Sequence, residues 1–344
     1  MSVVAPHVVV PDDIDAVPSG GNVYDRRVLA LSGWRELRVP VGDGAALAAA
    51  LRGVPDGGSV LVDGLVGGRA PEVLAPHAAR LRLVPLVHLP LADERGLAPG
   101  RARELRALET ATLRHAAAVA TTSRWTARRL VPAFGVDPAR VVVAPPGTDP
   151  APTAPGSAVT GARPRLLCLG TLTPTKGQDL LVDALAAVRD LHWTAALVGP
   201  VGRDPGFVVR LRARIAALGL ADRVTVPGPR TGPALETVWA ATDLLVVPSR
   251  TETFGMVVTE ALARGVPVLA ADVGGIREAG PTAWVSAENV GALAGALRDW
   301  LVDPVRRSGW RLSASGRRGT LSGWTTTVHR LRLALGSESG PGPG

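Results

Sequence analysis

The sequence has few of the residues that mark several common protein classes. Its 344 residues include one cysteine, Cys168, and its place in the apolar run 166–169 predicts a buried strand residue rather than a reactive thiol. Aromatic residues make up only 3%, so no stacking platform for single-stranded nucleic acid is visible. No apolar run reaches the roughly 18 residues that a membrane-spanning helix needs. No G-x-G-x-x-G occurs, so the fingerprint of a nicotinamide-binding site is absent.

Positive charge is carried almost entirely by arginine. The net charge is +8, and Lys176 is the single lysine among 38 basic residues. Because the excess is concentrated in residues 301–344 and is otherwise interspersed with acids, we expect no nucleic-acid partner. The N-terminus lacks a basic stretch, so we expect no signal peptide and a cytoplasmic location. The basic C-terminal region leaves peripheral contact with the inner membrane face as an alternative.

Apolar runs alternate with helical patterns along the chain, which predicts an α/β protein with parallel sheets. A hydrophobic content of 46% is enough for folded cores. The pattern predicts one helix over 101–118 and a last helix of the second half that ends at Trp300 and Leu301. The predicted parts are an N-terminal domain (1–148), a Pro/Ala/Gly-rich linker (149–164) and a C-terminal domain (165–320). An amphipathic helix (322–335) and a disordered tail (336–344) follow.

The stretch 248–280 places a strand-to-helix junction in the second half. The apolar run 243–247 predicts a buried parallel strand, and residues 255–264 predict the helix that follows it. A helix N-terminus at the carboxyl end of a parallel strand is where open α/β sheets bind phosphorylated ligands. The backbone amides that we expect to face a diphosphate there are those of Met256, Val257 and Val258.

Two carboxylates in this stretch, Glu252 and Glu260, have the spacing E-x7-E. A carboxylate accepts two hydrogen bonds from a vicinal diol, so the pair suits the diols of a sugar and a ribose. A structural interpretation also fits the same residues. Ser249 and Glu252 match a helix capping box, and Glu260 and Arg264 match a surface ion pair one helical turn apart.

The sequence PSRTETFGMVVTEALARGVPVLAADVGGIREA resembles the donor-binding signature of the retaining glycosyltransferases of family 4, of the actinobacterial type. The resemblance implies the GT-B fold: two Rossmann-like, doubly wound domains that face each other across a cleft, with helix 322–335 returning to the N-terminal domain. It also implies that Glu252 contacts the donor sugar and that Glu260 holds the ribose. The segment whose backbone meets the sugar and diphosphate would be Thr253, Phe254, Gly255, Met256 and Val257.

In the first half, Gly20 and Gly21 follow the first predicted strand and precede a helix predicted over 22–31. They let backbone amides approach a ligand, although a plain turn explains them equally. The family resemblance implies that they face the diphosphate, and that His88, at the end of a strand, lies near the anomeric carbon. A lone histidine is otherwise a satisfied core residue. The acceptor-side candidates are Asn22, Tyr24 and Asp63, the last with turn capping as its alternative.

In the second half, Lys176 comes just before a helix N-terminus, where an ammonium group can neutralise a phosphate. Lys176 and Gly177 match the lysine-glycine pair of the family pattern. Thr171 stands where the pattern has arginine, which removes one expected phosphate contact. Gly199, at the end of the next strand, is expected to line the nucleotide base.

These features predict an enzyme that moves a hexose from a nucleotide diphosphate sugar to an acceptor hydroxyl, with retention at the anomeric carbon. We expect no metal and no cofactor, and we interpret Asp13 and Asp15 as solvated loop residues rather than as a metal-binding D-x-D. The acceptor would be a small molecule or a lipid-linked compound. The alternatives are a nucleotide-sugar epimerase or isomerase on the same fold and a non-catalytic sugar-nucleotide binder.

Overall fold

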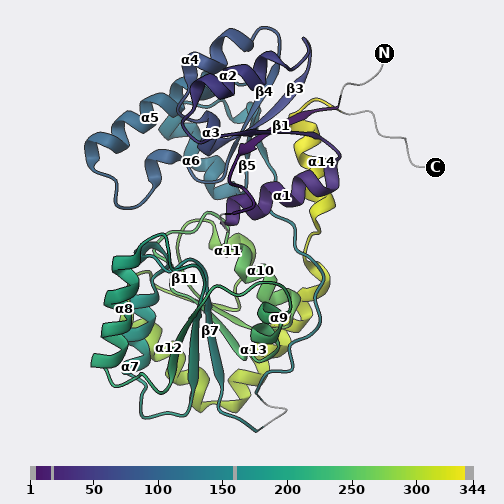
Figure 1. The fold of residues 1–344 in the computed structure, drawn as a ribbon. Coiled ribbons are helices and arrows are strands. Elements are labelled where there is room, and N and C mark those ends of the chain that lie inside the picture. The colour runs from purple at the N-terminus through teal and green to yellow at the C-terminus, as the bar shows by residue number, and fades with distance from the viewer. Residues whose placement is uncertain (1–4, 17–18, 158–160, 338–344) are drawn as a thin grey trace, which may run out of the picture. The chain divides into compact units, whose positions relative to one another are not determined.

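The computed structural model describes residues 5–16, 19–157 and 161–337. The chain forms two compact units (Figure 1): unit 1 consists of residues 1–147 and 323–344, and unit 2 consists of residues 148–322. Each unit contains one six-stranded sheet, and the strand pairs of both sheets are parallel. The α/β class predicted from the alternation of apolar runs and helical patterns is therefore confirmed.

Unit 1 has the strand order β2-β1-β3-β4-β5-β6. The chain therefore reverses its direction across the sheet between β1 and β3, and open parallel sheets bind ligands at the carboxyl ends next to such a reversal. The strands are β1 His7–Pro11, β2 Arg35–Val39, β3 Ser59–Asp63, β4 Arg82–Val87, β5 Val119–Thr121 and β6 Val141–Val143. The helices are α1 Gly20–Ser32, α2 Gly44–Arg52, α3 Gly64–Gly67, α4 Pro71–Leu74, α5 Pro99–Arg114, α6 Arg124–Phe134 and α14 Trp324–Ala334.

Helix α5 is shorter than the single helix predicted over 101–118, because it ends at Arg114 with His115 as its C-cap. Its buried face also contains a carboxylate, Glu109, which is 1% exposed. Glu109 Oε2 accepts a hydrogen bond from the Leu91 amide at 3.0 Å. Burial raises the pKa of Glu109 to about 8. The acid is buried because it satisfies the backbone that follows β4.

Helix α14 belongs to unit 1, where it packs against α1, β5 and β6. Arg82 Nε donates to the Ala334 carbonyl oxygen at 2.9 Å, and the Trp324 ring meets Tyr24 edge-on with centroids 5.6 Å apart. The C-terminal helix thus covers the sheet built by the N-terminal half. The predicted tail, 336–344, lies largely outside the described residues. Within the described residues, no helix combines the length and the hydropathy needed to cross a membrane.

Unit 2 has the strand order β12-β11-β10-β7-β8-β9, so its reversal lies between β10 and β7. Helix α12 ends at Val302, next to the end predicted at Trp300 and Leu301, but α13 follows it, so the prediction that this helix is the last of the second half is wrong. The strands are β7 Arg165–Leu169, β8 Thr194–Val198, β9 Val224–Gly228, β10 Leu244–Val247, β11 Val268–Ala271 and β12 Ala283–Val285. The helices are α7 Gln178–Ala186, α8 Pro205–Ala217, α9 Gly232–Ala240, α10 Met256–Ala263, α11 Ile276–Ala279, α12 Val290–Val302 and α13 Pro304–Arg317.

The segment predicted as a linker, 149–164, is packed on unit 2 where the structure describes it. The Ala154 amide donates to the Arg264 carbonyl oxygen at 2.9 Å, and the Ser157 amide donates to Asp243 Oδ1 at 2.9 Å. Ala154 and Ser157 are both buried. Its composition is that of a linker, but hydrogen bonds to the sheet edge hold this segment in place.

The core of unit 2 contains Trp193, which is fully buried and donates from Nε1 to the Val188 carbonyl oxygen at 2.8 Å. The Arg223 guanidinium lies over its ring, 3.9 Å from the centroid. Cys168 on β7 is buried in the same cluster, and burial raises the pKa of its thiol to about 12. The prediction that Cys168 is a buried strand residue is confirmed.

We predict that Trp193→Ala destabilises unit 2 by about 3–5 kcal/mol, because it leaves a cavity in a packed core. The matched control is Trp284→Ala on β12, where the side chain is half exposed and carries Arg277 over its ring. We expect the control to cost about 1 kcal/mol or less. Urea unfolding followed by circular dichroism measures both, and equal costs for the two variants would contradict the assignment of Trp193 to the core.

Candidate functional site

Two residues predicted to bind the donor meet at the reversal point of the unit 2 sheet. Lys176 lies in the 3-10 helix Pro174–Lys176 after β7, and Glu252 lies in the loop after the neighbouring strand β10. Lys176 Nζ is 2.5 Å from Glu252 Oε1, and Ser249 Oγ lies 3.0 Å from the same oxygen. The Glu252 side chain is 9% exposed and that of Lys176 is 34% exposed, so solvent or a ligand can reach the ammonium group.

Glycines bring the loops of this site into direct backbone contact. Gly177 has φ +70°, and a Cβ there would lie 2.1 Å from the Pro248 carbonyl oxygen. Gly274 has φ +54°, and its Cβ would lie 1.9 Å from the Glu252 carbonyl oxygen. The Gly275 amide donates to that same oxygen at 2.9 Å. A side chain at Gly177 or Gly274 would separate the loops, so the position of Glu252 depends on these glycines.

The structure overturns one structural interpretation of the carboxylates. Glu252 closes no capping box, because α10 begins after the N-cap Gly255 at φ +90°. Glu252 is held by Lys176 and Ser249 instead. Glu260 is half-buried on α10, and its carbonyl oxygen accepts a hydrogen bond from the Arg264 guanidinium at 2.9 Å. Arg264 also forms an ion pair with Glu236 at 2.6 Å.

The N-terminus of α10 carries the segment predicted to meet the diphosphate. No side chain of the described residues caps this end, which leaves the amides of Met256 and Val257 oriented out of the helix. The Val258 amide is not available as predicted, because it donates to the Gly255 carbonyl oxygen at 2.9 Å. Phe254 packs into the unit 2 core, while Thr253 lies half-buried in the loop. Any contact of Phe254 with a ligand would therefore involve its backbone.

Gly199 lies where the ends of β7 and β8 approach each other. A Cβ at Gly199 would lie 2.0 Å from the Gly170 carbonyl oxygen, so the close approach requires glycine there. The same Cβ position lies 3.3 Å from the amide nitrogen of Thr171, so Gly199 and Thr171 lie beside each other. The Thr171 carbonyl oxygen accepts a hydrogen bond from Gln178 Nε2 at 3.1 Å.

Arg250 connects the parts of this site, and its role was not predicted from the sequence. Its guanidinium forms a two-pronged pair with Asp179 on α7 at 2.7 and 2.8 Å, and Nε lies 3.2 Å from Glu288 Oε2. The guanidinium also donates to the Pro174 carbonyl oxygen, and the backbone amide of Arg250 donates to the Thr175 carbonyl oxygen. Burial would raise the pKa of Asp179, but the hydrogen bonds from Arg250 outweigh this and lower it. Arg250 thereby ties the Glu252 loop to the turn that carries Lys176.

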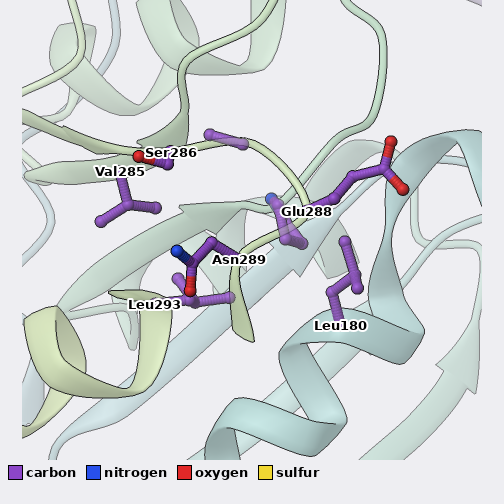
Figure 2. A pocket seen from close by; sticks show the side chains of 8 residues that line it. Leu180, Val285, Ser286, Glu288, Asn289 and Leu293 are labelled. Atoms are coloured by element: carbon purple, nitrogen blue, oxygen red, sulfur yellow. The ribbon is translucent and has the colours of Figure 1, made fainter. Parts of the chain in front are cut away.

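A small hollow lies beside this network, between the carboxyl ends of β10, β11 and β12 (Figure 2). Its volume is about 10 Å³, which is at most the space of one water molecule. Figure 2 shows Val285, Asn289 and Leu293 around it, while the Glu288 carboxylate extends away. Glu288 has φ 54°, a left-handed conformation that is uncommon outside glycine. The hollow is a packing gap, and Glu288 is held by its pair with Arg250.

In unit 1, three polar side chains gather at the carboxyl edge of the sheet. His88 follows β4, Asp63 ends the adjacent strand β3, and Asp25 comes from α1. His88 Nε2 lies 3.2 Å from Asp25 Oδ1 and 3.4 Å from Asp63 Oδ2. Asp25 and Asp63 are 1% and 3% exposed. Asp63 Oδ1 also accepts from the Leu65 amide at 2.7 Å, so the capping role predicted as an alternative is present as well.

The two carboxylates control the protonation of this cluster. Burial would lower the pKa of the His88 imidazole, but Asp25 and Asp63 outweigh it and raise that pKa well above its usual value. Burial raises the pKa of the Asp25 carboxyl, against the lowering effect of the His88 cation. The carboxylates therefore favour the imidazolium form of His88.

Gly20 and Gly21 form the first turn of α1 rather than a loop before it, so the helix starts earlier than predicted. Ser19 is the reason: it is the N-cap, and its Oγ accepts from the Asn22 amide at 3.0 Å. Gly20 is open to its surroundings, whereas a Cβ at Gly21 would lie 3.3 Å from His88 Cδ2. The amides of both glycines belong to a helix N-terminus, which is suited to an anion.

The other two acceptor-side candidates lie inside unit 1. Tyr24 is 1% exposed and its hydroxyl donates to the Ala144 carbonyl oxygen at 2.9 Å. Its ring also meets His88 edge-on, with centroids 5.1 Å apart. Asn22 is 5% exposed. These placements give Tyr24 a packing role around His88 and leave little of either side chain open to an acceptor.

Asp25, Asp63 and His88 each offer one atom that could coordinate a metal ion. Among the described residues, these atoms lie within 4.8 Å of one another. The distances of 3.2 and 3.4 Å from Nε2 are those of a shared N–H hydrogen bond. The raised pKa of His88 favours this interpretation, since a metal requires an unprotonated ring nitrogen.

The sequence matches two family descriptions. Glycosyl transferases group 1 matches residues 163–303, and Glycosyltransferase Family 4 matches residues 58–152. Among curated proteins, a D-inositol 3-phosphate glycosyltransferase of Kineococcus radiotolerans is 36% identical over 58% of this chain and 52% of its own length. One of Mycolicibacterium vanbaalenii is 33% identical over 74% of this chain and 62% of its own. The chain spans about half the length of the first curated relatives that it matches.

Solved structures share the fold over nearly the whole chain. Sucrose-phosphate synthase of Thermosynechococcus elongatus has a TM-score of 0.79 at 21% identity and covers 96% of this chain and 98% of its own. HepE of Anabaena, in complex with UDP-glucose, has a TM-score of 0.77 at 21% identity and covers 97% and 100%. The chain therefore contains two regions that match the glycosyl transferases group 1 and glycosyltransferase family 4 models, and its two-sheet architecture is the GT-B fold.

Proposed function

We propose that this chain transfers a hexose from a nucleotide diphosphate sugar to an acceptor hydroxyl, with retention of the anomeric configuration. The observation that carries the proposal is the Lys176–Glu252 pair at the reversal point of the unit 2 sheet. In this proposal the acid accepts hydrogen bonds from sugar hydroxyls and the cation binds the diphosphate, next to the N-terminus of α10. The two family matches and the likeness to HepE, whose structure contains UDP-glucose, support it.

In the proposed reaction the bond between the anomeric carbon and the β-phosphate oxygen breaks as the bond to the acceptor oxygen forms. The acceptor proton passes to the departing phosphate. Lys176 and the amides of Met256 and Val257 would stabilise the charge that develops on that phosphate. Glu252 would accept hydrogen bonds from the sugar hydroxyls and Glu260 from the ribose. From the family pattern, His88 and the amides of α1 would act on the same donor.

The names of the related proteins suggest the first compounds to test. HepE was solved with UDP-glucose, which makes UDP-glucose the first donor for a panel that also contains GDP-, ADP- and dTDP-sugars. The curated relatives are named for D-inositol 3-phosphate, which makes it the first acceptor. Release of the nucleoside diphosphate together with a glycosylated acceptor indicates transfer. A free sugar nucleotide of altered configuration would indicate an epimerase instead.

We predict that Glu252→Gln lowers kcat/KM by about 10- to 100-fold, because it removes a hydrogen bond to a charged group worth about 1.5–3 kcal/mol. Glu260→Gln should weaken donor binding to a similar degree. Thermal-shift titration with the donor and initial rates measure the two effects. The control is Glu236→Gln, whose acid pairs with Arg264 on the surface and should leave both unchanged. Unchanged rates in both test variants would contradict the assignment.

We predict that transfer continues in the presence of excess EDTA and without added Mg²⁺ or Mn²⁺. The physical reason is that Lys176 and the helix amides supply the positive charge that a divalent ion would otherwise provide. The measurement is the initial rate after chelation, compared with the rate after metal is added back. A loss of more than about 10-fold that metal restores would show that a metal ion takes part.

We predict that Arg250→Lys lowers kcat/KM by about 10-fold, because lysine cannot bond Asp179 with two prongs and reach Pro174 at once. The matched control is Arg298→Lys, which loses a similar two-pronged pair with Asp190. We expect both variants to change the melting temperature by a similar small amount. Equal activity in the two variants would mean that Arg250 serves stability alone.

A further inference from the structure

The cluster Asp25, Asp63 and His88 buries two carboxyl groups, and an apolar core can fold without them. A carboxylate removed from water costs free energy unless it is paired and hydrogen-bonded. Asp25 comes from a helix, is 1% exposed, and has one oxygen, Oδ2, with no hydrogen-bond partner among the described residues. Its other oxygen, Oδ1, faces His88 Nε2 at 3.2 Å. The placement of Asp25 therefore depends on the charge of His88.

The geometry requires hydrogen on Nε2 of His88 and favours the charged form of the ring. Nε2 faces two carboxylate oxygens, on Asp25 and Asp63, and ionised carboxylates only accept hydrogen bonds. The tautomer with a bare Nε2 would place a lone pair against these oxygens. Of the two forms that carry hydrogen on Nε2, the imidazolium is favoured over the neutral ring because two carboxylates lie within 3.4 Å of it.

Neighbouring groups also fix the orientation of the His88 ring. The backbone of Gly21 is close enough that a Cβ there would lie 3.3 Å from Cδ2. The Tyr24 ring covers another side, with centroids 5.1 Å apart. Thr122 Oγ1 donates to the His88 carbonyl oxygen at 3.4 Å. Tyr24 is the other titratable neighbour, and burial raises the pKa of its hydroxyl further, so it stays neutral.

We propose that Asp25 is a positioning residue that, together with Asp63, holds His88 as a fixed imidazolium, so that His88 acts in the proposed transfer as a cation and hydrogen-bond donor and not as an acid or base. The inference rests on the proposed function for its catalytic part only. The two acids make the cluster as a whole net negative, so His88 would act on an anionic leaving group through the N–H of the ring nitrogen that does not face them, while the amides at the N-terminus of α1 supply positive potential beside it.

The protonation of His88 can be measured without any substrate. The chain has six histidines, so two-dimensional ¹H–¹⁵N spectra of the imidazole rings across pH resolve the set, and His88→Gln identifies the resonance. We expect His88 to stay protonated to about two pH units above the usual histidine pKa of about 6.5. In Asp25→Asn we expect its midpoint to fall by about 1–3 units, which is the effect of losing one nearby opposite charge.

The internal control is His7, a second buried histidine of unit 1, whose pKa burial lowers and whose titration should not change in Asp25→Asn. Asp43→Asn, at the N-cap of α2, is the control for an aspartate of the same unit that is remote from His88. If Asp25→Asn does not fold, the wild-type titration still decides. A wild-type midpoint near 6.5, or line broadening of His88 by added Mn²⁺, would overturn the proposal.

Measurements of transfer activity distinguish a positioning role of Asp25 from a role in the stability of the fold alone. The measured quantity is kcat/KM at about pH 9 divided by kcat/KM at about pH 6.5. We expect this ratio to be at least about 10-fold lower in Asp25→Asn than in the wild type, because the variant loses its imidazolium in that pH range. Asp25→Glu should restore part of the ratio. An equal loss at every pH would leave Asp25 a structural residue. If no donor and acceptor react at all, the proposed function fails while the spectra still test the state of His88.

Discussion

The contact between Lys176 and Glu252 is the interaction on which the described carboxyl edge of unit 2 depends. The acid is almost completely buried, so its charge needs the ammonium group and the Ser249 hydroxyl to offset the loss of water. The pair forms only because the loops after β7 and β10 touch through glycine backbones at Gly177 and Gly274. In the absence of a ligand the two charges satisfy each other. A diphosphate and a sugar would offer each charge a new partner, which makes the pair a preformed and exchangeable site.

Unit 1 follows the same plan with different chemistry. Its reversal point carries a helix N-terminus at Gly20 and Gly21, and its polar cluster is centred on a histidine instead of a lysine. In both units a positive group lies where parallel strands end, and in both a buried carboxylate holds that group. Each carboxyl edge therefore holds a cation whose charge is balanced by acids, and those acids set the geometry and the protonation of the cation.

Much of the fold could be predicted because its signals are local. The alternation of apolar runs and helices identified the class, and the strand and helix predicted over 243–247 and 255–264 correspond to β10 and α10. Lys176 and Glu252 could be singled out because they stand at strand ends next to glycines, in motifs of characteristic spacing. That they touch could not be seen from the residues alone, since it depends on β7 pairing with β10. The start of α1 was missed because Ser19 caps the helix, whereas the two glycines that follow it were interpreted as loop residues.

The residues that were missed act at long range. Asp25 is a polar residue in an ordinary helix pattern, and only the folded sheet brings it to His88. Arg250 looks like a solvated loop residue in the sequence, yet its contacts lie on α7 and beyond β12. Helix α13 has a weakly apolar composition and depends on the Asp303 cap and on packing against α10 and α12. A buried charge leaves no periodic pattern in the sequence. The same is true of a helix that is stabilised mainly by its neighbours.

The near-exclusive use of arginine has a practical consequence at the candidate site. Guanidinium groups such as those of Arg223 and Arg318 donate to backbone carbonyl oxygens across the surface of unit 2, where a primary amine offers fewer directions. Lys176 is thus the only side-chain amine of the chain, and it is one-third exposed. Reductive methylation with isotopically labelled formaldehyde would therefore place one spectroscopic reporter, apart from the α-amino group, directly on the ion pair.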